Sequence, residues 1–395
     1  MDSKKRLSEI ALLQRGLTYN KGDEVPSSSK IVLRSNNIDL NSHSLDLSEL
    51  KYLREDFVIP EDRKVKKDSI FICMSNGSKQ HVGKVAFIDR DMDYAFGGFM
   101  GLIVPKPSIS AKYVFYACNP SSYRTFLSQI GNGIGITNLR FSELEKFEIP
   151  VPSIEEQQRI VDELDLLTGI IDKKNAQLRD LDVLAQSIFY EMFGDPSSNE
   201  KRWPVKSISE LFDVGSSKRV FESEWRDSGV PFYRAREIVR LSKGEKLEDP
   251  IFIEEALFAE YKQRYGVPKA GDIMVTGVGT LGICYLVKDT DRFYFKDGNT
   301  LWFKDKGLCN TRFIKDLYST DFIKDQIKAN AHGATVGTYT IVNAKNTRVI
   351  VPPIVLQNEY VNKILKIDAQ KELINESLKQ THHLVDSRMD YYFNE

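Results

Sequence analysis

The sequence predicts an α+β protein with two globular domains in a pseudo-two-fold arrangement, separated by two long helices that form an antiparallel coiled coil. Three observations lead to this prediction. The chain has 395 residues, which is enough for two or three domains. Residues 149–157 reappear as residues 349–357, displaced by 200 positions. Each copy precedes a long helical pattern, and the rest of the chain has short apolar runs divided by turn residues.

The same displacement extends through the chain and sets the domain limits. It pairs Arg34 with Arg234 and Leu178 with Leu378. We therefore expect a first globular domain at residues 1–150 and a first long helix at 151–196. A second globular domain follows at 197–350, and a second long helix at 351–395.

The first globular domain predicts strands at residues 70–74 and 85–88, on either side of a polar loop at 75–81. The second domain repeats the pattern with strands at 273–276 and 283–287. A helix is expected in each domain, at residues 111–129 and 312–330. Strands and helices mixed in this way are typical of an α+β domain.

The first long helix has an N-cap residue, Ser153, after the extended Pro-Val-Pro at residues 150–152. Its apolar seam, at steps of four and three, is Ile160, Leu164, Leu167, Ile171, Leu178, Leu181 and Ile188. Lys174 interrupts it. The second helix has the corresponding seam at Ile364, Ile367, Ile374, Leu378 and Val385.

Both seams have the period of 3.5 residues that is typical of a coiled coil. A single seam could equally well pack on the core of its own domain. Two seams in matching positions favour pairing between the helices. Antiparallel pairing would place the two domains at opposite ends, which is the pseudo-two-fold arrangement.

The formal net charge of −1 excludes a uniformly basic nucleic-acid coat, but the sign of the charge follows the segments. Residues 1–150 and 201–350 carry +3 and +5, whereas residues 151–200 and 351–395 carry −7 and −2. Mildly basic domains suit contact with DNA phosphates, although a solvated basic face is the commoner explanation of such charge. No run of about 18 apolar residues occurs and the cysteines form no Cys-x-x-Cys pair, so we expect a cytoplasmic protein with reduced thiols and no membrane partner.

Two motifs and the repeat carry a family resemblance. Residues 150–161 read Pro-Val-Pro-Ser-Ile-Glu-Glu-Gln-Gln-Arg-Ile-Val, and residues 189–196 read Phe-Tyr-Glu-Met-Phe-Gly-Asp-Pro. With the half-chain repeat, they resemble the specificity (S) subunit of Type I restriction-modification systems over essentially the whole chain. The resemblance implies that each globular domain is a target recognition domain and that each helix is a spacer.

The resemblance also implies partners and cofactors. Double-stranded DNA would be read as a bipartite, asymmetric site, and the coiled coil would dock two methyltransferase (modification) subunits. Restriction subunits would join the same complex. DNA methylation and ATP-dependent cleavage would occur in those partners, which would hold S-adenosylmethionine, ATP and magnesium, so this chain would need no cofactor of its own.

Base readout requires side chains that can bond to base edges, mainly Arg for guanine and Asn or Gln for adenine. Turn-forming or surface roles are about equally common for such residues. The DNA-binding candidates in the first domain are Arg34, Asn36, Asn37, Asn76, Lys79, Gln80, His81 and Arg140. Those in the second domain are Arg234, Arg236, Lys296, Asn299, His332 and Tyr339.

Catalytic motifs are absent from the sequence. No Gly-x-x-x-x-Gly-Lys-Ser/Thr motif for ATP occurs. The segments at 119–122 and 195–198 lack the second proline and the aromatic residue of an adenine methyltransferase motif. We expect no catalytic residues and no metal site, and hence a non-catalytic DNA-recognition subunit. The alternative is a pseudosymmetric coiled-coil scaffold that binds proteins only.

Overall fold

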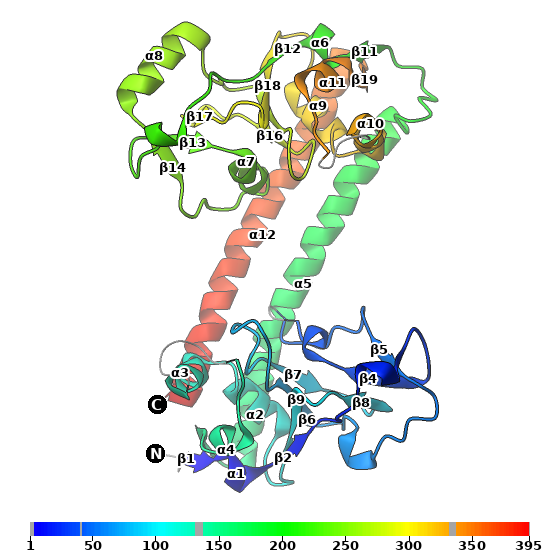
Figure 1. Cartoon of the computed structure of the whole chain (residues 1–395), viewed down its shortest axis with the longest axis vertical. Coiled ribbons are helices and arrows are strands. Elements are labelled where there is room, and N and C mark those ends of the chain that lie inside the picture. Colours follow the sequence, from blue (N-terminus) through cyan, green and yellow to red (C-terminus); the bar gives the residue numbers. More distant parts are fainter. Residues whose placement is uncertain (1–3, 40–41, 131–136, 332–336, 395) are drawn as a thin grey trace. The chain divides into compact units, whose positions relative to one another are not determined.

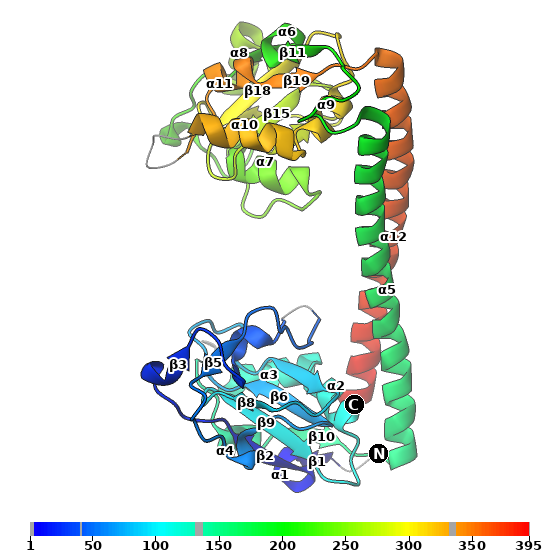
Figure 2. The ribbon, with the colours of Figure 1, turned by 90° about the vertical axis from the view of Figure 1, so that its right-hand side faces the viewer.

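A computed structural model describes residues 4–39, 42–130, 137–331 and 337–394. The chain divides into two compact units, one made of Met1–Gln177 with Ile374–Glu395 and the other of Leu178–Leu373. Each unit holds one globular domain and a part of both long helices, α5 (Ile154–Phe193) and α12 (Ile354–Asn394) (Figures 1 and 2).

The first domain is built on two four-stranded sheets. The antiparallel sheet has the order β2 (Ala11–Arg15), β9 (Met100–Pro105), β6 (Ser69–Cys73), β7 (Val85–Ile88). The other has the order β3 (Glu24–Val25), β5 (Lys51–Leu53), β4 (Lys30–Leu33), β8 (Tyr94–Phe96). A pair formed by β1 (Lys4–Arg6) and β10 (Glu148–Pro150) closes the domain next to α5.

Burial on both faces explains the composition of the central strand β6. All five of its residues are buried, because helices cover one face of its sheet and the β4 sheet covers the other. Such a strand reads as a continuous apolar run. The helices are α1 (Leu7–Ile10), α2 (Ala111–Ala117), α3 (Ser121–Ile130) and α4 (Phe141–Leu144), and the 3-10 turns are η1 (Lys21–Asp23), η2 (Ser35–Asn37) and η3 (Glu61–Arg63).

The second domain repeats this order. Its antiparallel sheet is β12 (Phe212–Gly215), β18 (Thr300–Asp305), β15 (Ile273–Thr276), β16 (Cys284–Leu286). Its smaller sheet is β14 (Ile251–Ile253), β13 (Val230–Tyr233), β17 (Tyr294–Phe295), and β11 (Val205–Ser207) pairs with β19 (Arg348–Ile350). The helical elements are α6 (Ile208–Leu211), η4 (Glu222–Glu224), α7 (Ala235–Ser242), α8 (Glu255–Tyr265), α9 (Thr311–Leu317), α10 (Asp321–Ala331) and α11 (Ile341–Asn346).

The single helix expected in each domain is instead a pair of helices, which corrects the prediction. In the first domain the break between α2 and α3 contains Pro120, which has no N–H and disfavours a helical residue before it. In the second domain Thr320 breaks the helix between α9 and α10, because both its backbone N–H and its hydroxyl donate to the carbonyl of Leu317, at 3.0 and 2.6 Å.

Two glycines at matching corners show how closely the domains correspond. Gly83 and Gly282 both follow the loop after the central strand and both have a positive φ, of 82° and 76°. A Cβ at Gly83 would lie 2.3 Å from Leu127 Cδ1, and one at Gly282 would lie 2.4 Å from Ile327 Cδ1. Only glycine allows the corner to pack this closely on α3 or α10.

The two long helices pair with opposite directions in each unit. In the first unit the beginning of α5 packs with the end of α12, where Arg388 Nε lies 2.5 Å from Glu163 Oε1. In the second unit the end of α5 packs with the beginning of α12, where the rings of Phe193 and Tyr360 lie 5.4 Å apart. This confirms the antiparallel pairing of the predicted coiled coil.

Part of each seam also packs on a globular domain. Ile160 and Leu164 share a core with α2, and so does Val385 from α12. Ile364 and Ile367 share a core with α9. The remaining seam residues are partly or fully buried along the helices: Leu167, Ile171, Leu178, Leu181, Ile188, Ile374 and Leu378. Pairing between the helices and packing on the domain, treated as alternatives in the sequence, both occur.

The cysteines Cys73, Cys118, Cys284 and Cys309 are free and buried. Burial raises the pKa of the Cys73 thiol to about 11, so it stays protonated at neutral pH. Among the described residues, no helix is both long enough and apolar enough to span a membrane.

Candidate nucleic-acid interface

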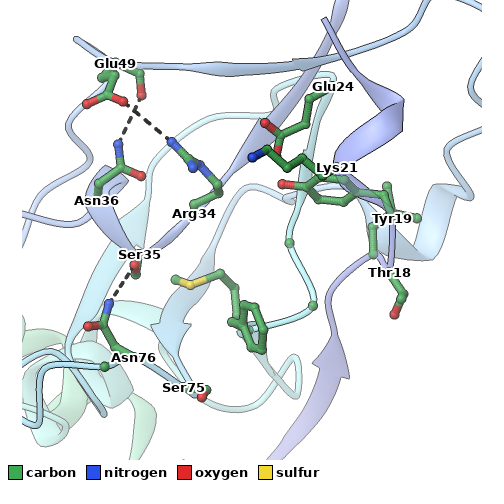
Figure 3. A pocket seen from close by; sticks show the side chains of 16 residues that line it. Thr18, Tyr19, Lys21, Glu24, Arg34, Ser35, Asn36, Glu49, Ser75 and Asn76 are labelled. Atoms are coloured by element: carbon green, nitrogen blue, oxygen red, sulfur yellow. Dashed lines mark hydrogen bonds and ion pairs between the residues drawn. The ribbon is translucent and has the colours of Figure 1, made fainter. Parts of the chain in front are cut away.

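A groove of about 880 Å³ opens on the first domain, and we call it the first groove. Segments far apart in the sequence meet there: the end of β2, the 3-10 turns η1 and η2, the loop after β6 and the turn before β9. Its lining is Leu17, Thr18, Tyr19, Lys21, Glu24, Arg34, Ser35, Asn36, Glu49, Ser75, Asn76, Gly77, Gly97, Gly98, Phe99 and Met100 (Figure 3).

Arg34 occupies the middle of this groove. Figure 3 shows its guanidinium between Asn36 and Glu49 on one side and Lys21 and Glu24 on the other. Its side chain is 32% exposed and its Nη2 lies 3.7 Å from Glu49 Oε1, a weak pair with an exposed carboxylate. The buried Nε has no hydrogen-bond partner within the described residues. Because its pair with Glu49 is weak and its side chain is partly exposed, Arg34 can still donate to a ligand.

Asn36 and Asn76 flank Arg34, and both of their side-chain amides already make hydrogen bonds within the domain. Asn36 Nδ2 donates to the Glu49 carbonyl at 3.5 Å, which is a weak contact. Asn76 Nδ2 donates to Ser35 Oγ at 2.9 Å, and its Oδ1 accepts from the backbone N–H of Ser78 at 2.8 Å. Asn76 thus links the loop after β6 to the η2 turn.

Asn37 does not face the groove, which corrects its assignment as a DNA contact. It is 1% exposed, and its Nδ2 donates to the carbonyls of Asp46 and Glu49 at 2.8 and 2.9 Å. Its Oδ1 accepts from the backbone N–H of Arg34 at 2.8 Å, in the same way that Glu237 accepts from Arg234 at 2.9 Å. Asn37 is a capping residue and its amide is not available to a base edge.

A buried lysine holds the segment that contains η2. Lys84 is 3% exposed, and its Nζ donates to the Ile38 carbonyl at 2.7 Å, directly after η2. Burial lowers the pKa of Lys84 from its ordinary value, because the charged form loses hydration. This contact fixes the position of η2 on the central sheet.

The loop after β6 extends beyond the groove. Lys79 and Gln80 are exposed at its tip, and His81 is half-buried. Burial, followed by the charge of Lys84, lowers the pKa of His81, so the imidazole is neutral at physiological pH. Arg140 is exposed at the start of α4 and is not among the groove residues.

The second domain has a different arrangement at the matching place. Two nitrogens of the Arg234 guanidinium donate to the Glu237 carboxylate, Nη2 to Oε1 at 2.7 Å and Nε to Oε2 at 3.1 Å. Glu237 is 2% exposed and also accepts from Arg236 Nε at 2.9 Å. Burial raises the pKa of Glu237, but the hydrogen bonds from Arg234 and Arg236 lower it by more, so the net pKa lies below its ordinary value. The Arg234 guanidinium is therefore occupied by Glu237, whereas the Arg236 side chain is 58% exposed and accessible to a ligand.

Lys296 and Asn299 lie on the turn that precedes β18. Lys296 Nζ lies 5.9 Å from the centre of the Trp225 ring, and Arg234 lies 6.0 Å from the same ring. Asn299 is partly exposed, and its side chain makes no hydrogen bond to the part of the chain that the structure describes. These residues form a second cationic and polar surface.

Tyr339 is the second candidate that the structure corrects. It is 1% exposed, and its hydroxyl lies 3.0 Å from the Tyr318 hydroxyl and 2.6 Å from Thr347 Oγ1. Its backbone N–H donates to Gly277, as that of buried Leu139 donates to Met74. Tyr339 therefore fills a core position. His332 lies outside the described residues.

Sequence reasoning missed the aromatic residues of both surfaces, Tyr19 and Phe99 in the first groove and Trp225 in the second domain. A weak signal existed in the glycines beside Phe99, since the Gly-Gly pair at 97–98 favours a turn. No group of His, Cys, Asp and Glu able to hold a metal ion occurs among the described residues.

Fold and surfaces together define a class of protein: a two-domain recognition protein, with a similar strand order in both domains and a different set of exposed side chains in each. A family model for the Type I restriction modification DNA specificity domain matches residues 3–180 and 200–381. The chain therefore belongs to this family and carries two copies of its domain. Membership confirms the resemblance and the role in DNA specificity that the sequence predicted.

Individual relatives of the chain are specificity subunits as well. The chain is 24% identical to the Type I restriction enzyme EcoKI specificity subunit of Escherichia coli (strain K12), over 96% of this chain and 86% of that protein. It is 31% identical to the StySPI specificity subunit of Salmonella potsdam over 44% of this chain and 38% of that protein. A crystal structure of the Type-I restriction-modification system S subunit from M. genitalium shares the fold, with a TM-score of 0.55, 16% identity and coverage of 99% and 96%.

Proposed function

We propose that the two domains read the two halves of a bipartite, asymmetric DNA site. The observation that carries the proposal is a shared scaffold with different side chains. In each domain an arginine precedes a helical element, η2 in the first and α7 in the second, and a buried capping residue holds that arginine's backbone N–H. The side chains that remain accessible differ between the domains, so two unlike half-sites are expected.

In the first domain we assign base contacts to Arg34, with Asn36 and Asn76 beside it. Lys79, Gln80, His81 and Arg140 would lie nearer the DNA backbone, because they are outside the groove. The groove itself balances Lys21 and Arg34 against Glu24 and Glu49, so it adds little net charge. Its contribution would be selectivity, with phosphate contacts supplying most of the affinity.

In the second domain we assign contacts to Arg236, Lys296 and Asn299. Arg234 would act indirectly, since its guanidinium is already bidentate to Glu237. His332 stays a candidate on the basis of the sequence alone. Lys296, over the Trp225 ring, suits the phosphate backbone or a guanine edge.

The helices would serve assembly and spacing. We propose that α5 and α12 dock two methyltransferase subunits and that the length of the helices sets the number of unread base pairs between the half-sites. Restriction subunits would join the same complex. S-adenosylmethionine, ATP and magnesium would bind to those partners, and no step of the reaction is assigned to this chain.

Mapping of methylated adenines in the host genome, with and without this gene, tests the proposal. We expect a gene-dependent bipartite motif with a fixed gap. Inserting four residues, about one helical turn, into α5 and four into α12 should lengthen the gap by one or two base pairs while both half-sites stay the same. An unaltered gap in active complexes would contradict the spacing role, and the absence of any gene-dependent motif would contradict the proposal as a whole.

A further inference from the structure

The turn at residues 97–100 presents an aromatic side chain in the first groove. Phe99 is 72% exposed and lines the groove together with Arg34 and Asn76. One exposed apolar residue is common on protein surfaces and needs no special explanation. Phe99 differs from such a residue because it shares a concave surface with hydrogen-bonding side chains and because its backbone is fixed.

Four backbone hydrogen bonds fix this turn. Gly97 N–H donates to the Leu33 carbonyl at 2.9 Å, and Met100 N–H donates to Gly97 at 2.8 Å. The Phe99 carbonyl accepts from the backbone N–H groups of Met74 and Ser75, at 2.9 and 3.1 Å. The turn therefore joins the ends of β4 and β6. A ligand that contacts the Phe99 ring would therefore lose little binding free energy to ordering the backbone of this turn.

The neighbouring strand adds a steric clamp. A Cβ placed on Gly16 would lie 1.9 Å from the Gly97 carbonyl oxygen, so the end of β2 touches the turn directly. Gly16 N–H also donates to the Met100 carbonyl at 3.2 Å. The turn is held from the side of β2 as well as from β4 and β6.

The second domain has an asparagine at the position of Phe99. The carbonyl of Asn299 accepts from Gly277 N–H at 2.9 Å, as that of Phe99 accepts from Met74. The strand register agrees, because Thr276 pairs with Thr300 as Cys73 pairs with Met100. One position on one scaffold thus carries an apolar ring in the first domain and an amide in the second.

We propose that this position is a specificity determinant and that Phe99 contacts the C5-methyl group of a thymine, beside the base that Arg34 contacts. This inference rests on the proposed function. In the major groove the thymine methyl is the apolar feature of a base edge, and phenylalanine is among the side chains that contact it. An asparagine at the same place suits adenine, with its N6 donor and N7 acceptor. Asn299 would thus read adenine in the other half-site.

The decisive measurement uses the assembled complex and duplexes that carry the mapped site. Each thymine of the half-site read by the first domain is replaced in turn by uracil, which lacks only the methyl group. For the wild type we expect one position at which uracil weakens binding about four-fold, as expected for the loss of one buried methyl-sized group. The Phe99→Ala variant should bind the thymine site about as weakly as the wild type binds the uracil site. It should no longer distinguish thymine from uracil.

Matched variants separate this effect from general damage. Leu12→Ala removes another exposed apolar side chain, 60% exposed, from β2 of the same domain and outside the groove, and it should keep the uracil penalty. Phe99→Asn should shift the preference at the same position from thymine towards adenine. Asn299→Ala should affect the other half-site only.

Several results would overturn the inference. It is wrong if no thymine occurs on either strand of the first half-site, or if Phe99→Ala keeps the full uracil penalty. The inference is also wrong if replacing thymine by uracil leaves wild-type binding unchanged while a mismatch in the same half-site strengthens it. That pair of results would indicate that the Phe99 ring stacks on a base that has left the duplex. Failure of the proposed function looks different, because the wild-type complex would then show no half-site preference at all.

Discussion

Gln157 ties the start of α5 to the start of α2, because its side-chain Oε1 accepts a hydrogen bond from the backbone N–H of Ser110 at 2.9 Å. Its Nε2 donates to the Pro152 carbonyl at 2.9 Å, and the side chain is 1% exposed. Gln357 makes the same two contacts in the second unit, with Asn310 N–H at 2.8 Å and Pro352 at 2.6 Å. The glutamine of the repeated motif is therefore a structural clamp between the long helix and the globular domain.

Gln157→Ala should lower the free energy of unfolding by about 1–3 kcal/mol, since it leaves buried polar groups without partners. Urea denaturation of the whole chain measures this change. Gln357→Ala should give a loss of similar size. Gln158→Ala, at an exposed position beside the clamp, should stay within about 0.5 kcal/mol of the wild type; an equal loss in that variant would argue against a specific clamp.

Lys174 interrupts the apolar seam of α5 but is bound by α12. Its Nζ donates to Ser377 Oγ at 2.7 Å, to Thr381 Oγ1 at 2.8 Å and to the Ser377 carbonyl at 3.1 Å. A charged group with three partners in a partly buried seam should stabilise one register of the helix pair.

We expect Lys174→Ala to lower stability by about 1–2 kcal/mol in urea denaturation. Its neighbour Lys173 is exposed and serves as the control. Lys173→Ala should leave the midpoint almost unchanged. Equal effects of the two variants would show that the loss comes from charge or helix propensity and not from the contacts with α12.

Glu163 links α5 to the end of α12 and should make this unit sensitive to acid. Arg388 donates to it from Nε at 2.5 Å, and the Tyr392 hydroxyl donates at 2.6 Å. The hydrogen bond from Arg388 lowers the pKa of Glu163 below the ordinary 4.5. A depressed pKa stabilises the folded state above 4.5, and this stabilisation is lost as the pH falls through the lower, folded-state value.

Glu163→Gln should therefore lower stability near neutral pH and reduce the loss that occurs as the pH falls below the ordinary 4.5 of a glutamate. Thermal denaturation at a series of pH values, for the variant and the wild type, measures both effects. Asp162→Asn, at the exposed position next to Glu163, should keep the acid dependence of the wild type. Parallel pH profiles for the wild type and Glu163→Gln would contradict the assignment.

Arg34 and Arg236 should act on different half-sites. Arg34→Ala removes the central guanidinium of the first groove and should weaken discrimination at one base pair of the first half-site by about 10- to 100-fold. Arg236→Ala should do the same in the second half-site. Competition binding with the assembled complex and duplexes altered at single positions measures both effects.

Arg54→Ala provides the control for Arg34. Its side chain is 55% exposed in the same domain and pairs with Asp23 and Asp56 outside the groove. We expect no change of base preference in this variant. A uniform loss of affinity for all sequences in Arg34→Ala would instead identify Arg34 as a phosphate contact.

Much of the scaffold could be predicted from the sequence, because the signals are local and occur twice. The seams, the Ser153 cap and the strand at β6 all follow from patterns within a few residues. The sequence predicts a single helix where the structure has the pairs α2–α3 and α9–α10. Pro120 is a breaker signal within the first pair, whereas Thr320 carries no such signal.

By itself, the sequence determined the repeat, the two long helices and the family. These depend on periodicity and on motifs that fall within continuous segments. Only the tertiary structure decided which polar side chains are accessible. Asn36 and Asn37 are adjacent and chemically identical, yet one borders a groove and the other is buried as a cap. Their difference depends on contacts with residues 46–49, and Tyr339 likewise depends on Tyr318 and Thr347, so no local pattern could have shown either.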